Sequence, residues 1–358
     1  MEINFESVLI TGGAGFLGSS LALAIKNLRP DCRVICLDNL IRNGSHLQLP
    51  RLEKAGIEFI QADVRSPKEW KNLSAECLIE CSAEPSVQAG MNGSPQYLLD
   101  TNLLGAINCL EWARINKAKF LFISTSRVYP VALLQEIPTV ADQTRLKWCS
   151  PRDNESYRTY EGLGIETPTF GGYRSLYGSS KLAAEMLVEE YVCTYGLEAS
   201  SIRFGVIAGP WQMGKVDQGF LTYWLAAHMY QKPLKYFGFG GSGKQVRGVL
   251  HVKDAVESII RVMAEVGKQS LYQVAGGMKN SISLMELTKM AQQISGHNVL
   301  IESISQTHKN DVPILLLDGK SSYESLGWNP QYSIQTVVED TYKWLNDNTD
   351  SLGPIFNT

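Results

Sequence analysis

Residues 8–18 read Val-Leu-Ile-Thr-Gly-Gly-Ala-Gly-Phe-Leu-Gly, an apolar run that leads into a glycine-rich turn. Gly12, Gly15 and Gly18 keep the spacing G-x-x-G-x-x-G between a predicted strand and a predicted helix. Such a turn is tight and brings the backbone close to a pyrophosphate, which glycine permits because it has no side chain. The helix start adds free N–H groups and a positive dipole end. An ordinary strand-to-helix turn is the alternative interpretation.

Asp38 supports the dinucleotide interpretation, because it ends the next predicted strand 20 positions after Gly18. A carboxylate there can accept hydrogen bonds from the adenosine ribose and would repel a 2′-phosphate. We therefore expect NAD rather than NADP, although Arg42 nearby leaves NADP open. Asp63 ends the third predicted strand, where either a contact to the adenine edge or a helix cap fits the local sequence.

The first 203 residues alternate short apolar runs with longer helical patterns, as in a parallel sheet with helices on both faces. The predicted strands are 8–10, 33–37, 58–61, 76–80, 119–123 and 199–203. The predicted helices are 16–27, 103–114 and 176–195. This pattern predicts an α/β fold with a Rossmann-type, doubly wound parallel sheet.

Past residue 203 the alternation becomes irregular, with predicted helices at 254–265, 284–295 and 337–346. We expect a dinucleotide-binding domain over 1–203 with a returning segment near 246–268. A smaller C-terminal substrate-binding lobe would comprise 204–245 and 269–350. Residues 126–173 lack clear periodicity, which is common in functional loops.

The composition argues against several classes of function. With 33 Lys and Arg against 36 Asp and Glu, the net charge of −3 gives no electrostatic case for binding nucleic acid or an anionic membrane. The seven cysteines form no CxxC pair, so we expect buried thiols in a reducing cytosol and no metal site. Without a signal-peptide pattern or a membrane-spanning run, a soluble, cytoplasmic protein is expected.

Tyr177 and Lys181 stand four residues apart in the predicted helix 176–195, so both side chains can face one ligand. The lysine ammonium would favour the phenolate form of the tyrosine and could hold the nicotinamide ribose. A phenolate can take the proton of a substrate hydroxyl while the carbon gives up a hydride. Thr125 follows a predicted strand at the end that faces the ligand crevice. Each feature alone is commonly a solvated helix face or a turn residue, but together they predict hydride-transfer chemistry.

These motifs together resemble the extended short-chain dehydrogenase/reductase superfamily over the first two hundred residues. The resemblance implies that Thr125, Tyr177 and Lys181 are catalytic, and Arg203 also matches the family pattern. It further implies that NAD is bound by Gly12, Gly15, Phe16, Leu17, Asp38, Asn39, Asp63, Val64, Ala83, Asn102, Tyr177, Lys181 and Val206.

Segments spread over almost the whole chain look like the CDP-paratose (CDP-tyvelose) 2-epimerases of that superfamily: 124–129, 174–178, 207–214, 216–219, 243–247 and 280–284. The similarity implies that NAD stays bound, that hydride leaves C2 of the sugar, and that it returns to the opposite face after the keto intermediate rotates. It implies a CDP-linked sugar substrate and a homodimer formed through helices 103–114 and 176–195. The implied substrate contacts are Glu84, Ser126, Arg127, Gln218 and Arg247.

Four positions depart from the family pattern: Gly248 replaces an aspartate, Gln273 an asparagine, and His308 and Pro313 stand where arginines are usual. Losing a bidentate arginine weakens the grip on a phosphate. Arg247 could still hold the diphosphate with help from Lys215 or Lys309, so the substrate is less specified than the cofactor.

Other interpretations stay open at this point. A 4-epimerase of the UDP-glucose type, a net dehydrogenase and a non-catalytic NAD-binding scaffold would share most of these motifs. A 4,6-dehydratase would need an Asp-Glu pair where this chain has Ser126 and Arg127. Among the substrate residues, Arg247 could be a surface arginine, Gln218 a capping side chain, and Arg127 an ion-pair partner of Glu84. His251 and Asp254 are expected to serve local structure.

Overall fold

The computed structural model describes residues 4–91, 93–151 and 155–357. Contacts divide the chain into two compact units. Unit 1 comprises Met1–Thr125, Leu176–Phe204 and Ala255–Tyr272, and unit 2 comprises Ser126–Ser175, Gly205–Asp254 and Gln273–Thr358.

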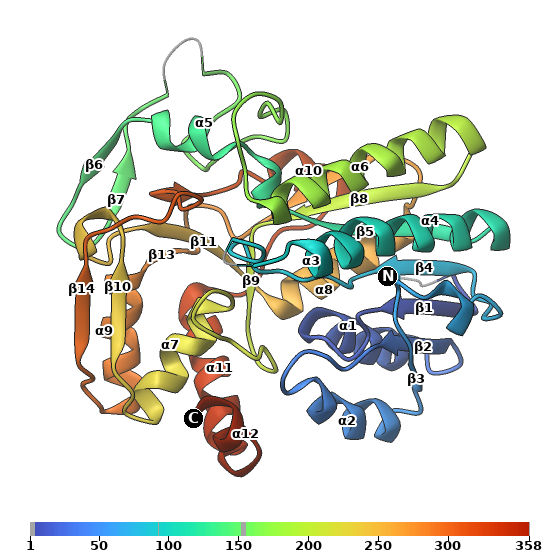
Figure 1. Cartoon of the computed structure of the whole chain (residues 1–358), viewed down its shortest axis with the longest axis horizontal. Helices are drawn as coiled ribbons and strands as arrows, with labels where there is room; N and C mark the ends of the chain where they lie inside the picture. Colours follow the sequence, from blue (N-terminus) through green and yellow to red (C-terminus); the bar gives the residue numbers. More distant parts are fainter. Residues whose placement is uncertain (1–3, 92, 152–154, 358) are drawn as a thin grey trace. The chain divides into compact units, whose positions relative to one another are not determined.

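A seven-stranded sheet has the order β12-β8-β5-β4-β1-β2-β3 (Figure 1). Its strands are β1 (Ser7–Thr11), β2 (Arg33–Asp38), β3 (Glu58–Gln61), β4 (Cys77–Glu80), β5 (Lys119–Thr125), β8 (Ala199–Phe204) and β12 (Leu271–Val274). The neighbouring pairs from β8 to β3 are parallel. The predicted Rossmann-type α/β fold is therefore confirmed, and the six predicted strands end within two residues of those observed. The sequence did not predict β12.

Helices pack along this sheet and bury its apolar side chains. In unit 1 they are α1 (Phe16–Leu28), α2 (Leu49–Lys54), α3 (Gln96–Leu99), α4 (Gly105–Asn116) and α6 (Leu176–Tyr195), and α8 (Val252–Ala264) lies mostly in the same unit. Helices α4 and α6 run along β5 (Figure 1). There Phe120 and Phe122 of β5 share a buried cluster with Ala184 and Val188 of α6. Helix α1 packs instead against β1 and β2.

Helix α6 has the predicted bounds, but the helix predicted at 103–114 begins later. Residues Asp100–Leu104 form a π-helical turn, and α4 starts only at Gly105. A π turn depends on tertiary contacts that hydrophobic periodicity does not reveal, and such turns often occur at functional sites.

The glycine-rich turn between β1 and α1 has no room for side chains. Gly12 has φ +64°, and a Cβ atom on Gly18 would lie 2.3 Å from the carbonyl oxygen of Gly12. A Cβ on Gly13 would lie 2.5 Å from Cβ of Cys36 in β2. Contacts below 3.0 Å are repulsive, so the fold itself requires glycine here.

Unit 2 contains shorter strands and several helices. They are α5 (Val131–Glu136), β6 (Thr139–Ala141), β7 (Leu146–Trp148), β9 (Val206–Ala208), α7 (Phe220–Met229), β10 (Leu234–Phe237), β11 (Val246–His251), β13 (Ser281–Ser283), α9 (Leu284–Ser295), β14 (Ile301–Ile304), β15 (Ile314–Leu315), α10 (Lys320–Leu326), α11 (Ile334–Asp347) and α12 (Thr349–Phe356). Strand β11 pairs with β9, β13 and β15, and β10 pairs with β14. The predicted helices at 254–265, 284–295 and 337–346 correspond to α8, α9 and α11.

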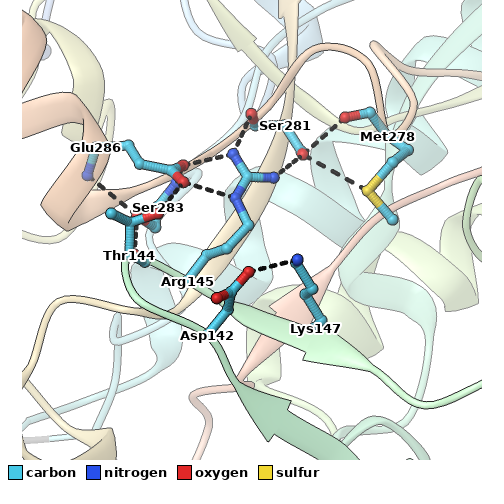
Figure 2. A network of polar contacts seen from close by, with 8 residues as sticks. All are labelled: Asp142, Thr144, Arg145, Lys147, Met278, Ser281, Ser283 and Glu286. Atoms are coloured by element: carbon cyan, nitrogen blue, oxygen red, sulfur yellow. Dashed lines mark hydrogen bonds and ion pairs between the residues drawn. The ribbon is translucent and has the colours of Figure 1, made fainter.

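Residues 126–175 lie in unit 2, whereas the sequence-based boundary placed them in the first domain. Arg145, which precedes β7, explains the difference. Its guanidinium forms an ion pair with Glu286 of α9 and donates a 2.8 Å hydrogen bond to Ser281 Oγ in β13 (Figure 2). Glu286 also forms a capping box with Ser283, so the hairpin β6–β7 is held at the start of α9. Contacts between residues so distant in sequence leave no periodic signal.

Four of the seven cysteines, at positions 32, 36, 77 and 109, are buried as expected, while Cys193 is exposed. No group of three or more His, Cys, Asp or Glu side chains in the described part of the chain could hold a metal ion. None of the helices in the described ranges combines the length and apolar character needed to cross a lipid bilayer.

His251 gives unit 2 a pH-dependent stability. It is fully buried, its ring stacks on Tyr332, and its Nδ1 accepts the N–H of Lys253. Burial lowers the pKa of His251 to about 4, and the nearby Lys253 acts in the same direction. The unfolded imidazole, with a pKa of about 6.5, takes up a proton first. The stabilisation is therefore complete above about pH 6.5 and disappears as the pH falls to about 4.

We predict that the free energy of unfolding falls by about 3 kcal/mol over this window because of His251. Urea denaturation at about pH 7 and about pH 4.5 measures this loss. The substitution His251→Gln should remove most of it, while His46→Gln at an exposed histidine should leave it intact. An equal pH dependence in both variants would contradict the assignment.

A second prediction concerns the turn before α1. Gly18→Ala should lower the free energy of unfolding by about 1–3 kcal/mol or more, because the added Cβ overlaps the carbonyl oxygen of Gly12. Gly353→Ala in α12 is the matched control, since a Cβ there meets nothing within 4 Å. Urea midpoints of the two variants provide the measurement. Equal midpoints would show that the turn tolerates a side chain.

Candidate active site

The three predicted catalytic residues all lie in unit 1. Thr125 is the last residue of β5, and its side chain is buried. Tyr177 and Lys181 lie one turn apart near the start of α6, which packs against β5. The α6 helix thus presents a phenol and an ammonium at neighbouring positions beside the strand that ends in a hydroxyl.

The ammonium of Lys181 is enclosed by the sheet. Its side chain is only 3% exposed, and Nζ lies 3.3 Å from Oε2 of Glu80 at the end of β4. The same nitrogen lies 4.3 Å from the centre of the Phe122 ring, a cation–π distance. A carboxylate and an aromatic face therefore compensate the buried charge.

A second buried ion pair follows one turn further along α6. Glu185 accepts hydrogen bonds from Arg203 of β8, with Arg203 Nη2 2.7 Å from Oε2. Ser124 of β5 donates to the other oxygen of the same carboxylate. The matched family residue Arg203 therefore has a structural role here, because it ties α6 to two strands of the sheet.

Asn102 lies on the π-helical turn and is completely buried. Its Oδ1 accepts the N–H of Glu84 at 2.8 Å, and its Nδ2 donates to the Glu84 carbonyl and to Ser180 Oγ. Asn102 therefore connects the loop after β4, which contains Ala83 and Glu84, to α6. The predicted site residues Ala83, Glu84 and Asn102 therefore form one connected region of unit 1.

The start of α1 fits the phosphates of a dinucleotide. Gly15 is its N-cap, and no side chain within the described residues hydrogen-bonds to the free N–H groups at this end, where Phe16 and Leu17 begin the helix. Gly15, Phe16 and Leu17 are partly exposed at this end of the helix. An anion can therefore reach the helix end and its positive dipole.

Asp38 lies beside this turn, as the ribose assignment requires. Its carboxylate accepts the N–H of Ala14 at 3.1 Å and that of Leu40 at 2.8 Å. Burial raises the pKa of Asp38, and these two hydrogen bonds act in the opposite direction. Each carboxylate oxygen has a further lone pair, so the group can still accept hydrogen bonds from ribose hydroxyls.

Asn39 and Asp63 line a shallow hollow together with Gln61, Ala62 and Glu69. The Asp63 carboxylate is held by Arg65 at 2.7 Å and by Asn39 at 2.9 Å, and the hydrogen bonds from Arg65 lower its pKa to about 2. Asp63 also accepts the N–H of Arg65. The N-cap of the following 3₁₀ turn, Pro67–Glu69, is Ser66, so the alternative of a helix cap at Asp63 is not observed. The side chain of Val64 belongs to the buried core. It packs so closely on Gly105 that a Cβ there would lie 2.8 Å from Cγ2 of Val64.

Arg247 in unit 2 is not a surface arginine. Its side chain is 12% exposed and Nη2 lies 2.7 Å from Oδ1 of Asp311. Burial lowers the pKa of Arg247, while Asp311 opposes that effect. The segment 308–313, which departs from the family pattern, therefore supplies a carboxylate partner to Arg247, the residue predicted to bind the diphosphate.

The other predicted substrate residues divide between the units. Arg127 follows β5 in a 3₁₀ turn of unit 2 that begins at Ser126, and its Nη1 donates to the carbonyl of Asn310. Gln218 lies in unit 2 in a turn whose backbone pairs with Lys215. Val206, which was predicted to contact NAD, begins β9 and also lies in unit 2. Glu84 belongs to unit 1, where its carboxylate accepts the N–H of Ser86.

Two of the departures from the family pattern have local explanations. Gln273 is fully buried, and its Nε2 donates to the carbonyls of Leu163 and Asp318 while Oε1 accepts from Tyr129. A Cβ on Gly248 in β11 would lie 3.2 Å from Cδ2 of Leu316. A longer side chain at position 248 would therefore press against Leu316.

The sequence did not single out Glu80 and Glu185, although both contact residues of the site. Glu185 continues the spacing of four from Tyr177 and Lys181, which places it on the same helix face. Glu80 ends the otherwise apolar strand Cys77–Glu80, and a charge in such a strand requires a partner. These two signals could have identified them.

Comparison with known proteins agrees with this geometry. A 28% identical relative, the CDP-paratose 2-epimerase of Salmonella typhi, aligns over 95% of this chain and 99% of its own length. The UDP-glucuronate 4-epimerase of Thermodesulfobacterium geofontis is 26% identical over 97% of this chain and 98% of its own. Both alignments span nearly full length, yet the two relatives differ in the sugar carbon and in the nucleotide.

A solved structure shares the fold. The dTDP-glucose 4,6-dehydratase of Bacillus anthracis in complex with NAD superposes with a TM-score of 0.76 at 22% identity, covering 98% of this chain and 99% of the other. The sequence model of the NAD dependent epimerase/dehydratase family matches residues 8–275, about three quarters of the 358 residues. The cofactor is therefore NAD, as the glycine turn and Asp38 predict. The chain belongs to the NAD dependent epimerase/dehydratase family.

Proposed function

We propose that this enzyme epimerises a nucleotide-linked sugar by transient oxidation and re-reduction at one carbon, namely C2 of a CDP-linked deoxyhexose. The observation that carries the proposal is the placement of Tyr177 and Lys181 on α6 beside β5, which ends in Thr125. A phenol, an ammonium and a hydroxyl are the groups that reversible oxidation of an alcohol needs.

In the proposed reaction Tyr177 removes the proton of the sugar hydroxyl as the adjacent C–H bond breaks. NAD, when bound, supplies reversible acceptance of the hydride. Lys181 favours the phenolate through its charge, and Thr125 hydrogen-bonds the reacting oxygen. After the keto sugar has rotated, Tyr177 returns the proton to that oxygen while the hydride returns to the opposite face of the carbon.

The choice of a CDP-linked sugar rests on the full-length similarity to the Salmonella enzyme and on the motifs at 124–129 and 207–214. A UDP-sugar 4-epimerase is the second candidate, because the Thermodesulfobacterium relative is nearly as similar. Ser126 and Arg127 stand where a dehydratase would need two acids, which disfavours water loss.

The proposal also includes the residues that would bind the diphosphate of the substrate. Arg247 and Arg127 both contact the segment 308–313, through Asp311 and Asn310 respectively. In the proposed complex, Arg247 shares its guanidinium between Asp311 and a substrate phosphate. Unit 1 would bind NAD, and Glu84 of unit 1 and Gln218 of unit 2 are the further proposed substrate contacts.

We also propose a cytoplasmic homodimer assembled through α4 and α6. Apolar side chains of these helices face outward: Ile115 is 67% exposed and Met186 is 49% exposed. Burying such residues in a helical interface would stabilise the pair.

One prediction of the proposed function tests the chemistry. Tyr177→Phe should lower kcat by about 10²- to 10⁴-fold, because the general acid–base group is lost while the ring is retained. The NAD content of the purified protein should stay close to that of the wild type. Tyr195→Phe at the far end of α6, about 27 Å along the helix, is the control and should retain activity. An active Tyr177→Phe variant would refute the mechanism.

Another prediction of the proposed function tests the substrate. NMR of the products should show inversion at C2 when the enzyme is incubated with CDP-paratose, and little conversion of UDP-glucose or UDP-glucuronate. Turnover of a UDP-sugar alone would assign the enzyme to the 4-epimerases instead. No conversion of any of the three would reject both assignments.

A further inference from the structure

Glu80 is a buried carboxylate that the proposed chemistry does not yet use. It ends β4, its side chain is 1% exposed, and in the sheet it stands between Thr11 of β1 and Phe122 of β5. An unpaired carboxylate in such a place would be strongly destabilising, so its partners indicate what it does.

Two groups hold the Glu80 carboxylate. Lys181 Nζ lies 3.3 Å from Oε2, and the Ser82 hydroxyl donates to Oε1 at 2.6 Å. Ser82 Oγ also lies 3.2 Å from Thr11 Oγ1 in β1. Because Ser82 and Thr11 are fixed by neighbouring strands, the carboxylate has a fixed position from which to hold the lysine.

Glu80 is the acidic partner of Lys181. The ammonium is almost completely buried, and on the sheet side it contacts Glu80 and the face of the Phe122 ring. A buried ammonium that loses its counter-ion gives up its proton more readily. A neutral lysine would exert no field on Tyr177 and would hold a ribose hydroxyl less well.

We propose that Glu80 is a positioning residue that keeps Lys181 charged and directed for its role beside Tyr177. The proposal rests on the proposed function, because it assumes that Lys181 serves a phenol that transfers protons. Glu80 itself touches neither sugar nor cofactor in this account and acts through the lysine.

Other charged or titratable groups lie near the Glu80–Lys181 pair. The contact with Glu80 remains the main electrostatic interaction of the lysine. Burial raises the pKa of Cys81 after β4 and that of Cys109 on α4, so both thiols stay neutral. Glu185 on α6 is compensated by Arg203 of β8. On the turn before α4, Asp100 accepts a hydrogen bond from Gln96 at an exposed position.

The test is the titration of Tyr177 in the NAD-bound protein without any sugar. The ultraviolet absorbance of tyrosinate, taken as the difference between a protein and its Tyr177→Phe counterpart, isolates this phenol from the other tyrosines. Glu80→Gln should move the titration midpoint to higher pH by about one unit or more, because the neighbouring positive charge is lost. Lys181→Met should give a shift of the same sign.

Three comparisons separate this effect from general damage. Glu80→Asp keeps the charge and should keep the midpoint close to that of the wild type. Glu155→Gln disrupts another largely buried ion pair, with Arg158 in unit 2, and should leave the midpoint unchanged. Adding Glu80→Gln to Lys181→Met should produce no further upward shift, because Glu80 acts through the lysine.

A midpoint in Glu80→Gln that stays unchanged or moves to lower pH would overturn the proposal. If Glu80→Gln does not fold, the double variant with Lys181→Met should fold better, because it removes both buried charges; equal failure of the two would also count against it. A normal titration shift combined with no epimerisation would reject the proposed function and leave the role of Glu80 standing.

Discussion

The buried ammonium of Lys181 is the constraint on which the site depends. A charge inside a protein persists only where other groups compensate it, and here Glu80 and Phe122 do so. Because Glu80 belongs to β4 and Phe122 to β5, these contacts tie the first turns of α6 to the sheet. The Glu185–Arg203 pair on the next turn adds a contact to β8. The orientation of Tyr177 therefore follows from electrostatics within the core as well as from apolar packing.

Much of unit 1 was predictable from the sequence because its signals are local. The glycine turn, the apolar strands and the long amphipathic helix at 176–195 each carry a pattern that a short window reveals. The prediction failed where tertiary contacts override periodicity. The π-helical turn before α4 delays that helix, and the hairpin β6–β7 belongs to unit 2 through Arg145, whose partners lie about 140 residues away.

The candidate site shows the same division. Asp38, Tyr177 and Lys181 could be predicted as candidate site residues because their spacing within or after an element is typical of the proposed chemistry. Glu80 was not predicted, since a carboxylate that is 101 residues from its lysine partner carries no spacing signal. On the substrate side, Arg247 was identified as a cation, but its pairing with Asp311 depends on how the segment 308–313 folds back onto β11. Substrate specificity is set in such loops, whereas cofactor chemistry is set in the sheet.

In the proposed mechanism, hydride leaves one sugar carbon and returns to the same carbon. It is tested most directly with CDP-paratose that carries deuterium at C2, incubated with the enzyme in ordinary water and followed by NMR. We predict an inverted product that retains its deuterium at C2, because the label is held within the site until it returns. Replacement of the deuterium by solvent hydrogen would contradict the account and would indicate proton abstraction from carbon instead.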